Sequence, residues 1–239
     1  MNRLAALTFA SASLFACSEP LPPADVAGLD DDFSAKEIDA AWKVLNASTF
    51  ERKQEGGKLV LKPTQNTVWY KADQGPGLVK RVTGNFRVST TARARKASDP
   101  EKAVDAGFQF AGIIARDPAS DEGEAKESYV FNVVGYRGDY LSVETKTTKK
   151  DVSYVEGPEW DSGDAELRIC RYNGELSVYK RPIGGKEWQL GIAYKRKDLP
   201  ATLQVGPIAY AYTDQWDLEA SFDEIRFAPV KDHADCIAD

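Results

Sequence analysis

The chain of 239 residues is poor in the side chains that most catalytic and metal sites use. It has a single histidine, His233, which argues against a Ser-His-Asp triad and against a zinc site built from several histidines. Cys-x-x-Cys, Gly-x-Gly-x-x-Gly and P-loop motifs are all missing, so the sequence shows no site for a nucleotide. The net charge of −6, from 37 acidic and 31 basic residues, argues against a nucleic-acid partner.

Long apolar runs are also missing, apart from a short one at the start of the chain. Arg3 is followed by the apolar run Leu4–Phe15, which is too short for a membrane span and is typical of a secretory signal. Its end, Leu-Phe-Ala-Cys, resembles the lipobox of bacterial lipoproteins. This resemblance implies a lipoprotein signal peptide over residues 1–16, cleaved after Ala16, and acylation of Cys17. The alternative is ordinary signal cleavage nearby, with Cys17 left as a thiol or a disulfide partner.

The segment that begins with this cysteine, residues 17–29, is predicted to be a spacer. Its prolines, Pro20, Pro22 and Pro23, favour an extended polyproline II conformation with a rise of roughly 3 Å per residue. In the sorting rule of enteric bacteria, a serine such as Ser18 after the acylated cysteine permits transfer to the outer membrane. We therefore expect a protein of the cell envelope, lipid-anchored at the outer membrane of a Gram-negative bacterium.

Cysteines are few, and their odd number of three leaves one outside any set of disulfides. If Cys17 carries lipid, Cys170 and Cys236 remain as a pair in an oxidising compartment. A bridge between them would hold the C-terminal tail, residues 231–239, against a strand. The alternative is two unpaired cysteines, because sequence alone does not give the distance between them.

Alternation of apolar and polar residues with period two recurs along residues 30–230. In residues 86–93, Phe, Val, Thr and Ala at the even positions alternate with Arg, Ser, Thr and Arg at the odd positions. The dipeptide Asn173-Gly174 lies between two alternating runs and predicts a β-hairpin. Many short strands without interleaved helices predict an all-β fold, an antiparallel two-sheet jelly-roll sandwich. No linker divides the segment, so we expect one domain.

One helical segment is expected near the start of this domain. Residues 34–45 have a helical pattern, with Ser34 as a helix-capping residue and Glu37 three positions later. The sequence therefore predicts one short helix before the strands.

Several segments resemble one family in the order in which they occur. They are DDFSAKEIDAAWKVLN, GGKLVLKPTQNTVWYKADQGPGLVKRVTGNFRVSTTARA, AGFQFAGIIARDP, AELRICRYNGELSVYKRPIGGKEW, LQVGPIAY and ASFDEIRF. Together, over about residues 30–228, they resemble the concanavalin A-like lectin/glucanase jelly roll of the laminin-G-like branch. Within it they are most similar to a bacterial domain family of uncharacterised function, found alone or beside glycoside hydrolases. The superfamily contains lectins, hydrolases and adhesion modules, so the resemblance implies a fold before a function.

The resemblance does not carry over a catalytic motif. Glucanases of this fold use a strand-borne Glu-x-Asp-x-x-Glu, and the only similar fragment here is Glu37-Ile38-Asp39. Trp42 stands where the third carboxylate would be, and the fragment lies in the predicted helix. We therefore expect a protein that is not an enzyme, with a glycoside hydrolase that uses an unrecognised carboxylate pair as an alternative.

Calcium is the cofactor that the resemblance implies, in a structural role. Members of this superfamily often tie the start of the first strand to the last strand through such an ion. The matching positions are Asp31 or Asp32 and Asp223. The alternative is that these acids only solvate turns, and no cofactor is required by anything else in the sequence.

Aromatic residues offer a glycan site, because sugars stack their C–H faces on Trp and Tyr. Trp160 and Trp216 lie in predicted loops, and Tyr210 and Tyr212 share one side of their strand. Arg168 points away from the apolar side of its own strand and is a candidate polar ligand residue. The alternatives are that the tyrosines pack at a sheet edge and that Arg168 pairs with a cross-strand acid.

These observations predict a membrane-anchored envelope lipoprotein whose β-sandwich binds a glycan or polysaccharide. The two alternatives are a structural or protein-interaction module of the envelope and the glycoside hydrolase named above.

Overall fold

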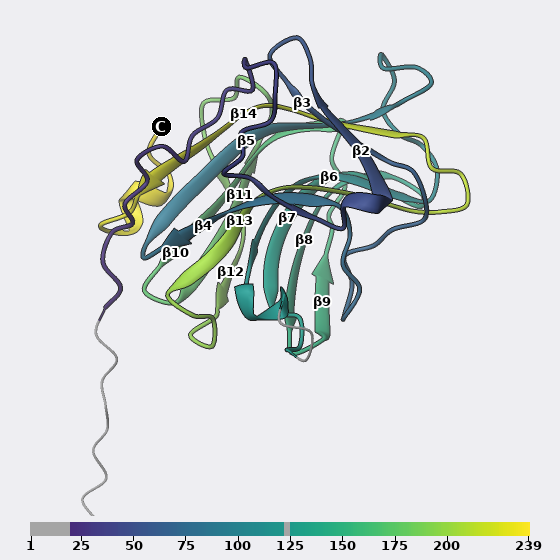
Figure 1. Cartoon of the computed structure of the whole chain (residues 1–239). Helices are drawn as coiled ribbons and strands as arrows, with labels where there is room; N and C mark the ends of the chain where they lie inside the picture. Colours follow the sequence, from purple (N-terminus) through teal and green to yellow (C-terminus); the bar gives the residue numbers. More distant parts are fainter. Residues whose placement is uncertain (1–19, 122–124) are drawn as a thin grey trace, which may run out of the picture.

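The computed structural model describes residues 20–121 and 125–239. In this part of the chain, fourteen strands form two antiparallel seven-stranded sheets that pack face to face, and the only helical elements are short 3-10 turns (Figure 1). The all-β two-sheet sandwich expected from the alternation is confirmed. The predicted signal peptide and Cys17 lie outside the described residues. Within residues 20–121 and 125–239, no helix is long and apolar enough to span a membrane.

Both sheets interleave strands that are distant in the sequence, as in jelly rolls. The first sheet has the order β1 (Lys43–Leu45), β4 (Gly77–Thr83), β13 (Thr202–Tyr212), β6 (Phe108–Arg116), β7 (Tyr129–Arg137), β8 (Leu141–Lys149) and β9 (Val152–Glu156). The second sheet has the order β12 (Gln189–Lys195), β11 (Glu175–Arg181), β10 (Asp164–Tyr172), β5 (Phe86–Lys96), β14 (Leu218–Pro229), β3 (Leu59–Pro63) and β2 (Phe50–Gln54).

The alternation in β5 sets its two faces as predicted. Phe86, Val88 and Ala92 are buried between the sheets, whereas Arg87 and Arg93 are partly exposed on the other side. A strand that presents alternate residues to opposite faces buries one set in a sandwich and leaves the other near solvent.

The hairpin predicted between β10 and β11 is also confirmed. Asn173 and Gly174 form a two-residue loop with φ angles of +46° and +79°. Both central residues of a type I′ turn need a positive φ, which asparagine and glycine tolerate best.

The short helix expected over residues 34–45 is wrong. This segment forms turns and ends in strand β1. Asp32 and Asp39 accept hydrogen bonds from backbone N–H groups two residues ahead, on Ser34 and Ala41. Such local side-chain bonds compete with the hydrogen bonds of a helix. Trp42 then packs into the core, and its Nε1 donates to the Asp31 carboxylate at 2.7 Å.

The first sheet is buried on both of its faces. Ala111, Ile113, Val134 and Ala209 face the second sheet and belong to the inter-sheet core. The opposite side of the sheet, called the outer face here, carries a second hydrophobic cluster that includes Phe110, Ile114, Phe131, Val133, Ile208 and Tyr210. Residues 64–76, called the covering segment, lie over this outer face and contribute the fully buried Trp69 to that cluster.

The second half of the expected spacer packs on the domain. The side chain of Asn85 donates to the carbonyl oxygen of Leu21 at 2.6 Å, and its backbone N–H donates to that of Pro22 at 2.7 Å. Ala24 N–H donates in turn to the Asn85 carbonyl oxygen at 2.8 Å, and Ala24 itself is buried. Leu21, Pro22 and Ala24 of the expected spacer therefore belong to the folded domain.

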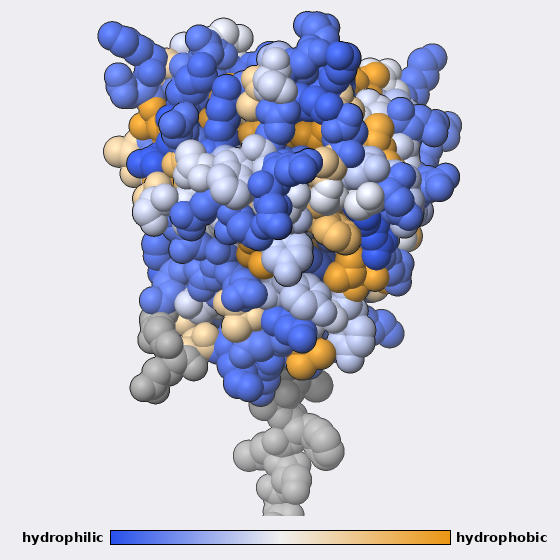
Figure 2. All heavy atoms as spheres, turned by 90° about the vertical axis from the view of Figure 1, so that its right-hand side faces the viewer, coloured by the Kyte–Doolittle hydropathy of each residue, from blue (hydrophilic) through white to orange (hydrophobic). Residues whose placement is uncertain are grey.

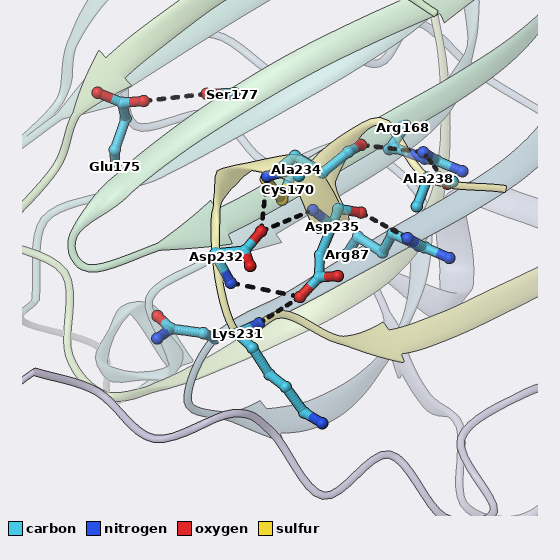
Figure 3. The surroundings of a disulfide bond; sticks show 12 residues. Arg87, Arg168, Cys170, Glu175, Ser177, Lys231, Asp232, Ala234, Asp235 and Ala238 are labelled. Atoms are coloured by element: carbon cyan, nitrogen blue, oxygen red, sulfur yellow. Dashed lines mark hydrogen bonds between the residues drawn. A yellow bond between two sulfur atoms is a disulfide. The ribbon is translucent and has the colours of Figure 1, made fainter.

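A disulfide joins Cys170 on β10 to Cys236 in the tail (Figure 3). The tail folds into a 3-10 turn, His233–Cys236, capped by the side chain of Asp232. The bridge expected between these cysteines is present, and it holds the tail on the outer side of the second sheet.

We expect the Cys170→Ser/Cys236→Ser variant to be less stable by about 2–4 kcal/mol, because the bridge closes a loop between residues 66 positions apart. Urea unfolding at neutral pH under non-reducing conditions measures the difference. Wild-type protein treated with reductant should match the variant. An unchanged unfolding midpoint in both samples would contradict this role of the bridge.

Candidate functional site

The five residues predicted to bind ligand do not form one groove. Tyr210 is buried on the outer face of the first sheet, while Tyr212, further along β13, is 53% exposed. Trp216 is exposed on the β13–β14 loop, and Trp160 is half-buried beside β10. Arg168 is on the second sheet and points away from the core. The predicted residues therefore lie in at least three separate places.

Buried charges lie beneath the covering segment, and the sequence analysis did not find them. Glu144 and Lys146 point to the outer face from β8, and each is only 3% exposed. The Tyr210 hydroxyl donates to Glu144 at 3.1 Å, and Lys146 Nζ lies 3.6 Å from the same carboxylate. Lys146 Nζ also donates to the Trp69 carbonyl oxygen at 2.7 Å.

Burial dominates the proton equilibria of this group. It raises the pKa of Glu144 and that of Tyr210, although Lys146 and Arg137 favour the charged form of Glu144. Burial lowers the pKa of Lys146 to about 8, against the opposing effect of Glu144. These side chains hold the covering segment in place and are shielded from solvent.

A second buried cation, Arg116, lies on the same face. Its guanidinium donates to both carboxylate oxygens of Glu127, at 3.0 and 2.8 Å, and to the Gln204 side chain at 2.8 Å. It also donates to Asp121 at 2.6 Å. Gln74 of the covering segment donates to Glu127, so this network also holds the segment.

Part of the outer face of the first sheet is open at the end of β6 and β13. Phe108 and Tyr212 are exposed there, with ring centroids 6.5 Å apart. Arg137 of β7 is paired in register with Phe108 and donates to the Gly157 carbonyl oxygen at 3.1 Å. Phe108, Arg137 and Tyr212 are called the aromatic strip here; both rings are exposed, and Arg137 is partly exposed.

Trp216 lies on a loop that is fixed close to this strip. The backbone N–H of Asp217 donates to the side chain of Gln109 at 2.9 Å, and Gln109 directly follows Phe108 in the sequence. The side chain of Asp217 accepts from the backbone N–H of Ser98 at 2.8 Å. The exposed indole is thus next to a residue, Asp217, that is bonded to two other segments of the chain.

The distribution of hydrophilic and hydrophobic residues on the surface in Figure 2 does not mark a further binding site. The side of the molecule shown in Figure 2 is covered mainly by hydrophilic residues, and hydrophobic ones gather there in separate patches. No single broad apolar patch marks a binding site on that side.

Trp160 lies in a different environment. It packs against the inter-sheet core, and its Nε1 donates to the Asp164 carbonyl oxygen at 3.0 Å. Lys180 Nζ lies 5.0 Å from the ring centroid, and burial lowers the pKa of this lysine. A cavity of about 420 Å³ adjoins the ring, lined also by Asp161 and Gln189.

Arg168 does not pair with a cross-strand acid. Its Nε donates to the hydroxyl of Ser89 on β5 at 2.7 Å. Its Nη1 donates to the carbonyl oxygens of Cys236 and Ala238 in the tail, at 2.9 and 2.8 Å (Figure 3). The residue therefore helps to hold the tail.

The expected calcium ligands are engaged with protein groups. Asp223 accepts two hydrogen bonds from the Arg93 guanidinium, and Asp31 accepts from Trp42. Asp31 and Ile225 of β14 exchange backbone hydrogen bonds at 3.0 and 2.8 Å, so the backbone already ties the domain start to the last strand. Among residues 20–121 and 125–239, no group of three or more metal-ligating side chains is found. Calcium stays a prediction.

Solved structures share this fold at low sequence identity. The GH43 BlXynB protein from Bacillus licheniformis has a TM-score of 0.64 and 14% identity, over 84% of this chain and 39% of that chain. A functionally unknown protein from Saccharomyces cerevisiae has a TM-score of 0.65 and 17% identity, over 80% and 98%. Lectin I-B4 from Griffonia simplicifolia has a TM-score of 0.53 and 12% identity, over 84% and 99%.

This chain spans only 39% of the GH43 protein's length. No protein-family model and no curated protein matches the sequence. Identities this low establish the fold alone, and at that level the expected two-sheet β-sandwich is confirmed.

Acid should destabilise the protein partly through Asp121. Burial alone would raise its pKa, but hydrogen bonds from Lys43, Arg116 and Gln204 outweigh burial and lower it to about 2. A carboxylate with a depressed pKa stabilises the fold above its unfolded pKa, near 3.8, and this contribution disappears as the pH falls toward 2.

We therefore expect Asp121→Asn to cost about 1–3 kcal/mol at pH 7, because Arg116 loses a charged partner. The difference from wild type should shrink between pH 4 and pH 2, as measured by urea unfolding at several pH values. A difference that stays constant down to pH 2 would contradict the assignment.

Proposed function

We propose that this chain is a glycan-binding β-sandwich protein without catalytic activity. The observation that carries the proposal is the aromatic strip, in which the exposed rings of Phe108 and Tyr212 are neighbours and Arg137 is paired in register with Phe108. Aromatic rings bind the C–H faces of sugars, and guanidinium groups donate to their hydroxyls. The fold is shared with a GH43 protein and a lectin, which supports a glycan as the ligand.

The carboxylates of the outer face support binding more than hydrolysis. Glycoside hydrolysis needs two accessible carboxyl groups on either side of the scissile bond. Glu144 and Glu127 are each 3% exposed, and they hold Lys146 and Arg116. They serve the packing of the covering segment, which leaves the strip as the open part of this face.

An array of immobilised polysaccharides tests the proposal, with wild type compared with the variants Phe108→Ala and Tyr212→Ala. Each variant should bind about fivefold to tenfold more weakly, because each loses one stacking surface worth about 1 kcal/mol. Tyr154→Ala is the matched control, since Tyr154 is a tyrosine on edge strand β9 that is 68% exposed.

The control variant should bind like wild type. Wild-type protein that binds no glycan on the array would overturn the proposal and favour a structural or protein-interaction module. An equal loss in the Tyr154→Ala control would overturn the assignment of the strip as the binding surface.

We also propose that the chain is a lipoprotein of the cell envelope, anchored through Cys17 at the outer membrane. The support is the sequence itself: an apolar run that ends in Leu-Phe-Ala-Cys, followed by a proline-rich segment. Several acyl chains on one cysteine hold a protein stably on a bilayer, whereas one chain does not.

The anchor is tested by mass spectrometry of the protein extracted from membranes of an expressing bacterium. The mature chain should begin at Cys17 and carry the mass of its acyl chains, and Cys17→Ser should shift the protein into the soluble fraction. An unmodified N-terminus downstream of Cys17 would rule the anchor out.

A further inference from the structure

A cavity of about 350 Å³ lies where the start of the described chain meets the hairpin between β10 and β11. Its volume is in the range of small-molecule sites. Pro20 and Leu21 line one side, and Asn173 and Gly174 of the hairpin turn line another. The rest of the lining comes from the end of β10 and from residues 196–201, which join β12 to β13.

Hydrogen bonds hold these walls together. The side chain of Asn85 donates to the Leu21 carbonyl oxygen at 2.6 Å and accepts from the backbone N–H of Asn173 at 2.9 Å. The backbone N–H of Arg196 donates to the Gly174 carbonyl oxygen at 2.7 Å. The chain start, the hairpin turn and the loop before β13 are therefore joined, and the cavity exists before a ligand arrives.

The charges that line the cavity are all positive. Arg171 is only 1% exposed and lies at the floor, whereas Lys197 is exposed and lies at the rim. The other residues of the lining are uncharged. Asp198 follows Lys197 in the sequence, but its carboxylate accepts from the Arg196 guanidinium at 3.0 Å and does not line the cavity. A cavity with this lining favours an anion.

Arg171 is a buried cation whose partners are all neutral. Its guanidinium donates to the carbonyl oxygens of Ala201 at 2.9 Å and of Pro200 at 2.7 Å. Its Nε has no hydrogen-bond partner in residues 20–121 and 125–239. Burial is the only effect on its pKa, which falls to about 10, so the group stays charged at neutral pH. A buried charge without an opposite charge is costly, and an anion in the cavity would compensate it.

The cavity lies close to the proposed lipid anchor. Pro20, at its edge, is three positions after Cys17 in the sequence. A tether this short keeps the cavity near the surface of the bilayer, where the phosphates of phospholipid headgroups are the abundant anions. Leu21 and Leu199 add apolar walls for the uncharged part of such a lipid.

We propose that this cavity binds the phosphate of an anionic phospholipid headgroup, with Lys197 and Arg171 as its charged partners. Guanidinium and ammonium groups both bind phosphate in proteins. The proposal rests on the proposed anchor at Cys17, which brings the cavity to the membrane, and it adds a second contact between the domain and the bilayer.

The second contact would orient the domain. Ala201 in the lining directly precedes β13, and Tyr212 of the aromatic strip is the last residue of that strand. A strand rises about 3.3 Å per residue, so the strip lies roughly 30 Å from the cavity. An anchor at one cysteine limits the distance from the bilayer but leaves the domain free to rotate. A headgroup held in the cavity would turn the strip away from the membrane.

The test is calorimetric titration of the full acylated chain in a nonionic detergent with dihexanoyl phosphatidylglycerol. Dihexanoyl phosphatidylcholine, with the same acyl chains, is titrated separately. Phosphatidylglycerol should bind at least about tenfold more tightly, because the choline group brings a positive charge next to Lys197. Inorganic phosphate, titrated in a third experiment, should bind more weakly than phosphatidylglycerol, because it makes no contact with the apolar walls.

Two variants test the charged partners. Lys197→Gln should weaken phosphatidylglycerol binding about threefold to tenfold, and Arg171→Gln at least as much, since each removes one charge from the cavity. Lys195→Gln is the matched control, because Lys195 is an exposed lysine on β12 that does not line the cavity. It should bind like wild type. Lys197 is exposed, so its variant keeps the test valid even if Arg171→Gln fails to fold.

Equal binding of the two lipids, or an equal loss in Lys195→Gln and Lys197→Gln, would overturn the proposal. Inorganic phosphate bound as tightly as phosphatidylglycerol would overturn the lipid as the ligand. An acylated chain that does not bind phosphatidylglycerol would overturn this inference and leave the anchor standing. A chain that binds phosphatidylglycerol but carries no acyl group by mass spectrometry would support the cavity and overturn the anchor alone.

Discussion

The burial of the first sheet on both faces is the constraint on which the rest of the structure depends. Strands β6, β7 and β13 lie between the inter-sheet core on one side and the covering segment on the other. Polar groups in such a layer must find partners, because water does not reach them. Lys146, Glu144 and Arg116 therefore occur in networks that also fix the backbone of the covering segment. The covering segment therefore closes much of the outer face of the first sheet and leaves the aromatic strip exposed at one end.

Buried cations bond to different groups on the two outer faces of the sandwich. On the first sheet, the buried cations Lys146 and Arg116 each have a carboxylate partner and a structural task. On the second sheet, Arg87 and Arg168 bond to main-chain oxygens of the C-terminal tail and hold it in place. Removing one partner of a buried charge pair leaves the other charge buried and uncompensated, which destabilises the packing arrangement. Buried cations therefore hold the covering segment on the first sheet and the tail on the second.

The sequence alone predicted the structural features that depend on neighbouring residues in the chain. The alternation in β5 and the Asn173-Gly174 turn depend on neighbours in the chain. The pairing of Cys170 with Cys236 is different, because the sequence favoured it only if Cys17 carries lipid. The helix expected over residues 34–45 failed because aspartate side chains capture backbone N–H groups there, a competition that a pattern of apolar residues does not register.

The candidate site was less accessible to prediction, because it depends on contacts between distant segments. The alternation in β13 correctly placed Tyr210 opposite Ala209, but it did not reveal that the covering segment buries one tyrosine and leaves Tyr212 open. A signal was present in the nearly continuous apolar runs FQFAGIIA and YVFNVVGY, which are typical of strands buried on both faces. Loop tryptophans such as Trp160 and Trp216 carry no such signal.

The docking of Leu21 and Pro22 on Asn85 has a consequence for where the domain can work. Only four positions separate Cys17 from Leu21, and an extended chain advances about 3.5 Å per residue. A tether fixed at Cys17 is then no longer than about 14 Å, roughly half the thickness of the hydrocarbon layer beneath it. If Cys17 is anchored as proposed above, the sandwich stays close to the headgroups, and a ligand has to come to the membrane surface to be bound.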